Sequence, residues 1–258
     1  MQLSLNEVYN EDCLIGMQKI PDSSIDMVLC DLPYGTTSNK FDKRVELEPL
    51  WEQYKRICKE NAAIVLFSQM PFGAELIMSN KKMYRYEWIW QKRLGQGWLN
   101  SHKMPLRLHE NILVFYRKLP TYNAQKWQGK PYSKKHDGVK STSNYRNKSD
   151  YITGSKDGSR YPVDVIQIGT PYTMQKEEKP VHPTQKPVAL LEYLIKTYTN
   201  EGEVVLDNCI GSGSTAVACI NTNRYFIGFE IEKKYCEVAR LRIEGARRKL
   251  TGRQNMQE

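Results

Sequence analysis

The stretch from residue 203 to residue 215 is Glu203-Val204-Val205-Leu206-Asp207-Asn208-Cys209-Ile210-Gly211-Ser212-Gly213-Ser214-Thr215. Its short apolar run predicts a buried strand that ends close to Asp207. Gly211 and Gly213 permit a tight turn and close backbone approach, and the helix-prone residues 216–220 offer free N–H groups at a positive helix end. The lysine of a Walker A loop is absent, and Ala216 replaces the third glycine of a Gly-x-Gly-x-x-Gly loop. The stretch therefore indicates a strand–turn–helix unit of the nucleotide-binding kind.

A second strand candidate follows this loop and ends in an acid. It is Arg224-Tyr225-Phe226-Ile227-Gly228-Phe229-Glu230. Glu230 lies 17 positions after Gly213, close to the offset of about 20 residues at which a carboxylate meets ribose hydroxyls in nucleotide-binding folds. The alternative is a strand-end acid that caps the next helix.

The first half of the chain has its own strand-end acid. The apolar run Ile25–Cys30 predicts a buried strand, and Asp31-Leu32-Pro33-Tyr34 follows it directly, at the strand end where open α/β sheets bind ligands. Pro33 fixes its own φ and keeps Leu32 extended. The resulting turn presents a carboxylate, carbonyl oxygens and an aromatic ring, which suits an exocyclic amine on a flat ring. The alternative is a turn with no role in binding.

Four motifs in this order resemble a known family. The Asp31–Tyr34 turn resembles the Asp-Pro-Pro-Tyr motif of the S-adenosylmethionine-dependent amino-methyltransferases of nucleic acids. The loop Asp207–Thr215, the strand Phe226–Glu230 and the segment His182-Pro183-Thr184-Gln185-Lys186-Pro187 resemble three further motifs of these enzymes. The catalytic motif comes first and the cofactor motif last, which is similar to the β group of DNA amino-methyltransferases. Methylases that modify small-subunit ribosomal RNA, and protein-glutamine methylases, have the opposite order of motifs.

The resemblance covers nearly the whole chain and implies a set of residues that bind S-adenosylmethionine. Asp12, with Cys13 beside it, occupies the place of an acid that binds the adenine amine, although an Asp there also suits the N-cap of a helix at 14–19. The segment Thr184–Lys186 corresponds to the part that reaches the methionine end, although a lysine is more often a solvated surface residue. The residues expected at the cofactor are Asp12, Cys13, Asp31, Thr184, Gln185, Lys186, Asp207, Gly211, Ser212, Gly213, Ser214, Thr215 and Glu230.

The resemblance also implies the catalytic residues, and here the chain departs from the family pattern. The residues expected to be catalytic are Asp31, Leu32, Pro33 and Tyr34. Leu32 replaces the usual first proline but keeps the carbonyl, and Asn208-Cys209 replaces a frequent Pro-Phe. The segment Trp88–Lys92 resembles the strand that lines the target-base pocket, although its aromatic residues also suit the core.

Positive charge concentrates in one segment. Residues 117–180 hold 13 Lys and Arg against six Asp and Glu, interleaved with tyrosines and a tryptophan. A basic, aromatic-rich insert of low periodicity suits contacts with phosphates and base edges, and in the permuted family this is the target-recognition region. The alternative is a mobile, solvated loop with no role in binding. The residues expected to bind nucleic acid are Lys126, Lys130, Lys134, Lys135, Lys140, Arg146 and Lys148.

Composition limits the remaining choices. With 258 residues the chain can bury one α/β core, and its longest apolar run, Ala62–Phe67, is too short to span a bilayer. Neither an N-terminal signal segment nor a Cys-x-x-Cys pair occurs. We therefore expect a cytoplasmic protein with reduced thiols, no bound metal and no membrane partner.

These observations predict a doubly wound α/β fold with a mostly parallel sheet of the seven-stranded type, the Rossmann-like fold of class I methyltransferases in circularly permuted order. We expect a single domain, in which residues 1–116 form the catalytic half, 117–180 the inserted target-recognition region and 181–258 the cofactor-binding half. The strands are expected at Met27–Cys30, Ala62–Ser68, Glu87–Gln91, Asn111–Tyr116, Val204–Leu206 and Tyr225–Glu230.

The resemblance implies transfer of a methyl group from S-adenosylmethionine to a flipped base in DNA. An acid at position 31 is commoner in adenine-N6 enzymes, so adenine is the expected target and cytosine N4 is the alternative. A catalytically silent subunit that binds nucleic acid is a third possibility, for which a broken cofactor loop or a lost Asp31 is expected. We expect a monomer or a homodimer, with a cognate restriction endonuclease as a possible neighbour.

Overall fold

The computed structural model describes residues 3–35, 44–136, 151–169 and 185–254. The chain divides into two compact units, of which the first comprises Met1–Asn123 with Asp164–Glu258 and the second Ala124–Val163. The described part contains no helix long and apolar enough to cross a membrane.

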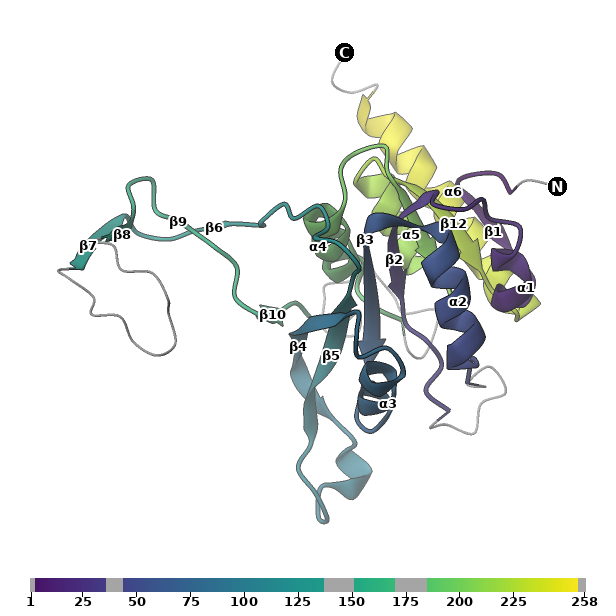
Figure 1. The fold of residues 1–258 in the computed structure, drawn as a ribbon, viewed down its shortest axis with the longest axis horizontal. Helices are drawn as coiled ribbons and strands as arrows, with labels where there is room; N and C mark the ends of the chain where they lie inside the picture. The colour runs from purple at the N-terminus through teal and green to yellow at the C-terminus, as the bar shows by residue number, and fades with distance from the viewer. Residues whose placement is uncertain (1–2, 36–43, 137–150, 170–184, 255–258) are drawn as a thin grey trace. The chain divides into compact units, whose positions relative to one another are not determined.

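The first unit is an α/β sheet with helices on both faces (Figure 1). In chain order its elements are β1 (Glu7–Tyr9), α1 (Cys13–Met17), β2 (Ile25–Cys30), α2 (Leu47–Ile57), β3 (Cys58–Ser68), α3 (Phe72–Ser79), β4 (Tyr84–Gln96), the 3-10 helix η1 (Trp98–Asn100), β5 (Arg107–Phe115), β10 (Val165–Gln167), α4 (Val188–Tyr198), β11 (Val204–Asp207), α5 (Ser214–Asn221), β12 (Tyr225–Phe229) and α6 (Lys233–Gln254).

The sheet has the strand order β1-β12-β11-β2-β3-β5-β4-β10. Only β5 runs antiparallel to its neighbours β3 and β4, and all other described pairs are parallel. The predicted doubly wound, mostly parallel fold is therefore confirmed. The sheet has eight strands and not seven, because the short β10 adds to the edge strand β4.

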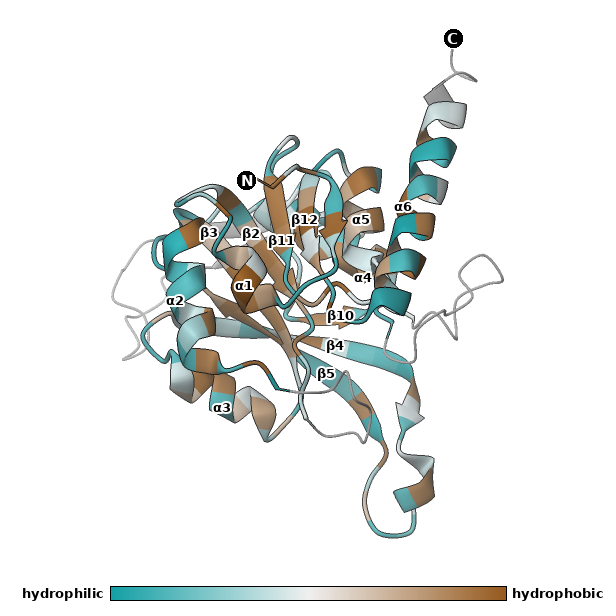
Figure 2. Cartoon of the chain, turned by 90° about the vertical axis from the view of Figure 1, so that its right-hand side faces the viewer, coloured by the Kyte–Doolittle hydropathy of each residue, from teal (hydrophilic) through white to brown (hydrophobic). Residues whose placement is uncertain are grey.

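Both faces of the sheet are buried, and this explains the continuous apolar runs in the sequence. Alternate residues of β2 enter opposite cores: Met27 and Leu29 pack with α4, α5 and α6, while Val28 and Cys30 pack with α1, α2 and α3. Figure 2 shows these two groups of helices on opposite sides of the brown, hydrophobic strands. Each fully buried leucine or isoleucine contributes about 1.5–3 kcal/mol to folding.

The two halves of the chain meet at adjacent central strands. β11 and β2 pair in parallel, with Val205 opposite Met27 and Leu206 opposite Val28. The helix that follows β2 covers one face, and the helix that follows β11 covers the other. The loops after β2 and β11 therefore diverge at a topological switch point, which is the usual ligand site of an open α/β sheet.

The observed elements match most of the expected ones, with two omissions. All six predicted strands are present, and β4 and β5 extend well beyond their predicted limits. Helix α4 spans Val188–Tyr198, with Leu190, Leu191, Leu194 and Ile195 buried. Helices α2 and α3 were not predicted individually. Phe72 and Leu76 of α3 bury one apolar face in the core beside α2.

The second unit contains two short antiparallel ladders. β6 (Trp127–Gln128) pairs with β9 (Ser159–Arg160), and β7 (Tyr132–His136) pairs with β8 (Tyr151–Ser155). Cations lie over exposed aromatic rings within the unit: Lys126 Nζ is 4.6 Å from the Tyr161 centroid, and Arg160 Cζ is 4.0 Å from the Tyr132 centroid. The low periodicity of this segment in the sequence corresponds to strands too short to show alternation.

Candidate active site

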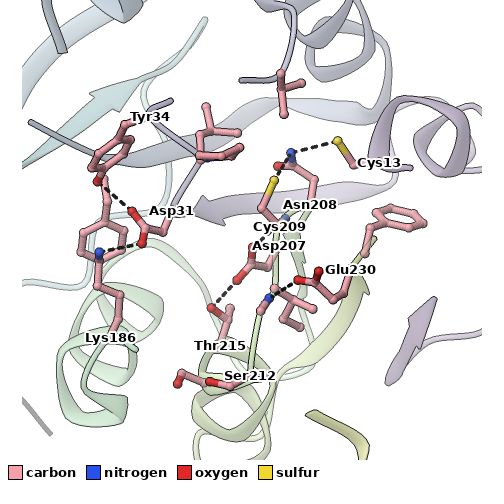
Figure 3. Close-up of a pocket in the computed structure, with 18 of the residues that line it drawn as sticks. Cys13, Asp31, Tyr34, Lys186, Asp207, Asn208, Cys209, Ser212, Thr215 and Glu230 are labelled. Atoms are coloured by element: carbon pink, nitrogen blue, oxygen red, sulfur yellow. Dashed lines mark hydrogen bonds and ion pairs between the residues drawn. The ribbon is translucent and has the colours of Figure 1, made fainter. Parts of the chain in front are cut away.

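A pocket of about 580 Å³ opens at the carboxyl ends of β2 and β11. Its wall is formed by the turn after β2, the loop after β11, the acid after β12 and the start of α4 (Figure 3). Cavities of this size hold ligands as large as nucleosides. Although residues 31 and 207 are far apart in the chain, they meet here because their strands are neighbours and parallel.

Asp31 is the centre of one side of the pocket. Its Oδ1 accepts a hydrogen bond of 2.7 Å from the Tyr34 hydroxyl, and its Oδ2 accepts one of 2.6 Å from Lys186 Nζ. The Asp31 side chain keeps 25% of its surface exposed, toward the pocket. The Tyr34 ring packs on Phe72 with centroids 5.2 Å apart, so the ring is held while one edge lines the cavity.

Lys186 joins Asp31 to a second buried carboxylate. Its Nζ lies 3.1 Å from Glu110 Oε2, and Glu110 Oε1 also pairs with Lys92. Lys92 in turn donates a 2.6 Å hydrogen bond to Gln96, and Gln69 donates one of 3.2 Å to Glu110. Two carboxylates and two ammonium groups thus form one network on the pocket wall.

This network perturbs the titration of its members. Burial raises the pKa of Asp31 in spite of the neighbouring Lys186. Burial also acts to raise the pKa of Glu110, but the ammonium groups of Lys186 and Lys92 overcome it and lower that pKa to about 2. Burial lowers the pKa of Lys92, partly offset by Glu110. Glu110 is therefore the firmly ionised carboxylate, and Asp31 is the one closer to accepting a proton.

Asp207 anchors the glycine-rich loop. Its Oδ2 accepts a 2.6 Å hydrogen bond from Thr215 Oγ1, and its Oδ1 accepts one of 3.1 Å from the Cys209 N–H. Burial raises the pKa of Asp207 to about 7, although the bonds from Thr215 and Cys209 oppose the shift. The carboxylate therefore ties the end of β11 to the first turn of α5.

Glu230 closes the opposite side of the pocket. Its Oε2 accepts a 3.0 Å hydrogen bond from the Gly211 N–H, and its Oε1 accepts one of 2.8 Å from the Glu232 N–H. Burial raises its pKa. Two backbone donors hold the carboxylate in one orientation, and each oxygen keeps a lone pair for a further donor.

Gly213 does not line the pocket, unlike its neighbours. Its φ is +80°, and a Cβ there would lie 2.9 Å from Ala239 Cβ in α6. The residue therefore serves the turn and the approach of α6, and does not contact the cavity. Arg242 of α6 fixes the same loop, because it donates hydrogen bonds of 2.8 Å to the Ser212 carbonyl and 3.0 Å to Ser214 Oγ.

At the other rim, Asp12 is the N-cap of α1, as the alternative interpretation predicted. Its Oδ1 accepts hydrogen bonds from the N–H groups of Leu14 at 2.8 Å and Ile15 at 3.3 Å. Asp12 and Cys13 also line the pocket. Between the two halves, Asn208 accepts a 2.6 Å hydrogen bond from the Tyr54 hydroxyl, which fixes the position where the family often has a proline.

The structure brings most of the predicted site residues to one cavity. Those on its wall are Asp12, Cys13, Asp31, Leu32, Pro33, Tyr34, Gln185, Lys186, Asp207, Gly211, Ser212, Ser214, Thr215 and Glu230. Thr184, Lys140, Arg146 and Lys148 lie outside the described residues. Lys126 and Lys130 are exposed in the second unit, where Lys134 and Lys135 belong to β7 and only their backbone is described.

Sequence reasoning missed Glu110 and did not assign Lys92 a role. The alternation of residues along the strands does contain a signal for this pair. Lys92 lies on the same face of β4 as the buried Trp88 and Trp90, and Glu110 lies on the same face of β5 as the buried Ile112. Opposite charges on the buried face of adjacent strands predict a buried ion pair. Trp90 serves both the core and the pocket wall, whereas Trp88 belongs to the core and donates to the Tyr198 hydroxyl.

The cysteines at the pocket are free thiols. Cys13 and Cys209 line the pocket, Cys30 is buried directly before Asp31, and burial raises the pKa of Cys30 to about 12. Protonated thiols are poor nucleophiles and poor metal ligands. Within the described ranges, no group of three or more His, Cys, Asp or Glu side chains is arranged to hold a metal ion.

Comparison with known proteins gives consistent matches. Residues 25–241 match the family model N6_N4_Mtase, described as DNA methylase. The chain is 29% identical to the type II methyltransferase M.HpaI of Haemophilus parainfluenzae, over 89% of this chain and 71% of the relative. It is 32% identical to the type II methyltransferase M.BglII of Bacillus subtilis, over 91% of this chain and 68% of the relative.

Solved structures share the fold at lower sequence identity. The cytosine-N4-specific PvuII DNA methyltransferase superposes with a TM-score of 0.66 at 15% identity, covering 93% of this chain and 87% of that one. The complex of M1.HpyAVI with SAM gives a TM-score of 0.60 at 22% identity, covering 92% and 98%. At these identities the likeness establishes the fold and not the target base.

Proposed function

Because the chain belongs to the N6_N4_Mtase family of DNA methylases, we propose that it transfers a methyl group from S-adenosylmethionine to the exocyclic N6 of adenine in DNA. The observation that carries the proposal is the meeting of the Asp31–Tyr34 turn and the Asp207–Glu230 loop region at one pocket. A cofactor held by the second region therefore lies next to an amine held by the first.

The pocket wall has groups suited to S-adenosylmethionine. Glu230, whose two carboxylate oxygens are oriented by backbone donors, is suited to bind the ribose hydroxyls, and Asp12 on the same wall is the proposed partner of the adenine amine. The buried loop residues Ser212, Ser214 and Thr215 form another part of the wall. When bound, the cofactor supplies an electrophilic methyl group on a sulfonium sulfur.

The amine is held by the turn after β2. Asp31 and the Leu32 carbonyl accept its two N–H bonds, which favours a pyramidal nitrogen whose lone pair is available. The Tyr34 ring packs against the base, and its hydroxyl fixes Asp31 through the 2.7 Å hydrogen bond. Orientation and electrostatic preorganisation therefore do most of the work, and no covalent enzyme nucleophile is required.

Lys186 has contacts that the resemblance did not imply. The family analogy places this segment at the methionine end of the cofactor, but Lys186 Nζ lies between Asp31 and Glu110. We propose that Lys186 orients the Asp31 carboxylate toward the amine. The Lys186 ammonium also pairs with Glu110, so this residue of β5 helps to position the Asp31 carboxylate.

We propose that residues 117–180 recognise the DNA target. Lys126 and Lys130 are exposed in the second unit, and Lys126 lies over the Tyr161 ring. Such cation and ring pairs offer both phosphate neutralisation and base stacking. Each phosphate contact should contribute about −0.9 to the log–log slope of affinity against salt on duplex DNA.

The target base is decided by analysis of the product. Purified protein is incubated with plasmid DNA and S-adenosylmethionine, and the DNA is digested to nucleosides for mass spectrometry, with the Asp31→Ala protein as the control. N6-methyladenine in the wild-type reaction alone is the expected result. N4-methylcytosine without N6-methyladenine would reject adenine in favour of cytosine. If neither product forms on DNA of any source, the remaining interpretation is a catalytically silent subunit that binds nucleic acid.

A further inference from the structure

The β4–β5 hairpin has a tip that the proposed chemistry does not use. We define this hairpin tip as residues 93–108. Nearly all of its side chains are exposed, and the large apolar ones are Leu94 at 65%, Trp98 at 71%, Leu99 at 75%, Met104 at 58%, Leu106 at 44% and Leu108 at 39%. No other described residue of the first unit covers this dense group of apolar side chains, which marks an interaction site.

The hairpin tip has a defined, hydrogen-bonded backbone conformation. Gly97, with φ of +88°, starts η1, and the Asn100 N–H donates 2.9 Å to the Gly97 carbonyl. The Lys103 N–H donates 2.8 Å to the Asn100 carbonyl, which closes the next turn. Gly95 allows the two arms to approach, because a Cβ there would lie 2.8 Å from Leu106 Cβ. The apolar side chains are therefore presented on a folded turn.

The charge of the hairpin tip points to a polyanion. It contains Arg93, Lys103 and Arg107, together with His102, and its sequence has no Asp or Glu. A surface made for a second protein chain is usually depleted in charge at its centre. Basic side chains that flank exposed apolar ones instead suit a nucleic acid, whose phosphates take the charges and whose bases take the apolar groups.

The position of the hairpin tip connects it to the pocket. β5 is antiparallel to β3, with Asn111 opposite Ser68 at the carboxyl end of β3, so the start of β5 projects beyond the same edge at which Asp31 lies. Figure 2 shows β4 and β5 extending past the rest of the sheet. Gln96 and Arg107, which pair with each other, line the pocket. Trp98 is only two residues beyond Gln96, a span of at most about 7 Å of chain.

We infer that the hairpin tip is a duplex-DNA contact, in which Trp98 and Leu99 insert at the target step while Arg93 and Lys103 bind the flanking phosphates. This inference rests on the proposed function and extends it from the reacting base to the opening of the duplex. A base cannot reach Asp31 inside a stacked helix, so extrusion leaves a gap next to the pocket. Apolar side chains inserted beside that gap offset part of the unstacking.

The test compares double-stranded and single-stranded DNA. The variant Trp98→Ala/Leu99→Ala and the wild type are assayed for transfer of tritiated methyl groups to plasmid DNA, native or heat-denatured. For native DNA, kcat/KM should fall about tenfold or more, the size expected for one lost stacking contact. Denatured DNA needs no extrusion, so its kcat/KM should change less than threefold. Calorimetry should give an unchanged affinity for S-adenosylmethionine.

A second variant tests the charges without using turnover. Arg93→Ala/Lys103→Ala should flatten the log–log dependence of affinity on salt by up to about 2, measured by fluorescence anisotropy with a labelled random 30-base-pair duplex. Leu241→Ala is the control, because Leu241 is 69% exposed on α6 and belongs neither to the pocket wall nor to the hairpin tip. It should behave as the wild type in both assays.

The outcomes separate this inference from the proposed function. If the wild type methylates DNA but both hairpin variants keep wild-type kcat/KM and salt dependence, the inference is overturned and the function stands. If the wild type transfers no methyl group but Arg93→Ala/Lys103→Ala lowers the salt slope, the hairpin binds DNA although the proposed reaction fails. If Trp98→Ala/Leu99→Ala converts a dimer to a monomer in sedimentation, the occupant is a second copy and the DNA assignment is wrong.

Discussion

The substitution Glu110→Gln removes one charge from the buried network without changing the shape of the side chain. Glu110 is 6% exposed and pairs with Lys92 and Lys186, which are 3% and 10% exposed. The amide keeps the size and an acceptor oxygen. We therefore expect the fold to survive while two buried ammonium groups share the single remaining carboxylate, Asp31.

The size of the effect follows from the pKa of Glu110. The two lysines lower it from 4.5 to about 2 in the folded protein. That difference corresponds to about 3 kcal/mol of stabilisation at neutral pH. The same order, about 3–5 kcal/mol, is typical when one partner of a buried ion pair is lost. Glu110→Gln should therefore lower the free energy of unfolding by about 3 kcal/mol at pH 7.

The pH dependence has a definite sign. The pKa of Glu110 is lower in the folded chain than in the unfolded chain, so its stabilisation is complete above pH 4.5 and is lost as the pH falls toward 2. Protonated Glu110 resembles glutamine. The difference between the wild type and Glu110→Gln should therefore shrink from about 3 kcal/mol at pH 7 to about 2 kcal/mol at pH 3.5.

Urea unfolding followed by circular dichroism, at several pH values between 7 and 3.5, measures this difference. Glu60→Gln is the matched control, because Glu60 pairs with Lys118 at a site where both side chains are more than 60% exposed. Its unfolding curve should match the wild type. A difference for Glu110→Gln below about 1 kcal/mol at pH 7, or one that grows on acidification, would refute the buried network.

Two further predictions concern the pocket itself, and a third concerns the glycine-rich loop beside it. Glu230→Ala should weaken S-adenosylmethionine binding by about 1–3 kcal/mol in calorimetry, and equal affinities would reject the ribose role. Tyr34→Phe keeps the ring but loses the 2.7 Å bond to Asp31, so turnover should fall about tenfold, whereas Tyr34→Ala should cost about a hundredfold; the reverse order would exclude packing on the base. Gly213→Ala, at φ +80° and with its Cβ 2.9 Å from α6, should lower stability by about 1–3 kcal/mol. Gly245→Ala is the control in α6, because a Cβ there meets nothing within 4 Å, and it should raise stability by up to about 1 kcal/mol. If both variants instead lost a similar amount of stability, α6 would not press on Gly213.

The fold was largely readable from the sequence because its central strands are buried on both faces. Val204–Leu206 and Tyr225–Phe229 are short apolar runs with turn residues on either side, so strand length and strand ends were both marked. The acids Asp31 and Glu230 directly follow two such strands, and Asp207 is the last residue of a third. Parallel strands bring their carboxyl ends to one edge, so the position of the pocket could be predicted without a structure.

The helices and the polar interior were harder to predict, for physical reasons. Helix α2 begins at Leu47 without a side-chain cap and passes directly into β3 at Cys58, so no capping or turn residue marks either boundary. The partner of Lys186 could not be found from its own motif, because Glu110 lies in a strand 76 residues earlier. Spatial pairing of distant charges depends on strand register, which local patterns do not specify.

The four charges on the pocket wall have a consequence for any experiment on Asp31. Asp31 and Glu110 carry two negative charges and Lys92 and Lys186 carry two positive ones, so the buried group as a whole is neutral. Removing Asp31 leaves an excess positive charge in a region of low dielectric. An inactive Asp31→Ala protein could therefore have lost stability as well as the acceptor for the amine.

The double substitution Asp31→Asn/Lys186→Met separates these two effects, because it restores neutrality without restoring the carboxylate. We expect it to unfold closer to the wild type than Asp31→Asn does, since the excess buried charge is gone. Its methyl transfer should remain undetectable, because no carboxylate faces the amine. Turnover that recovers along with stability would mean that Asp31 acts through the folding of the pocket wall and not on the target base.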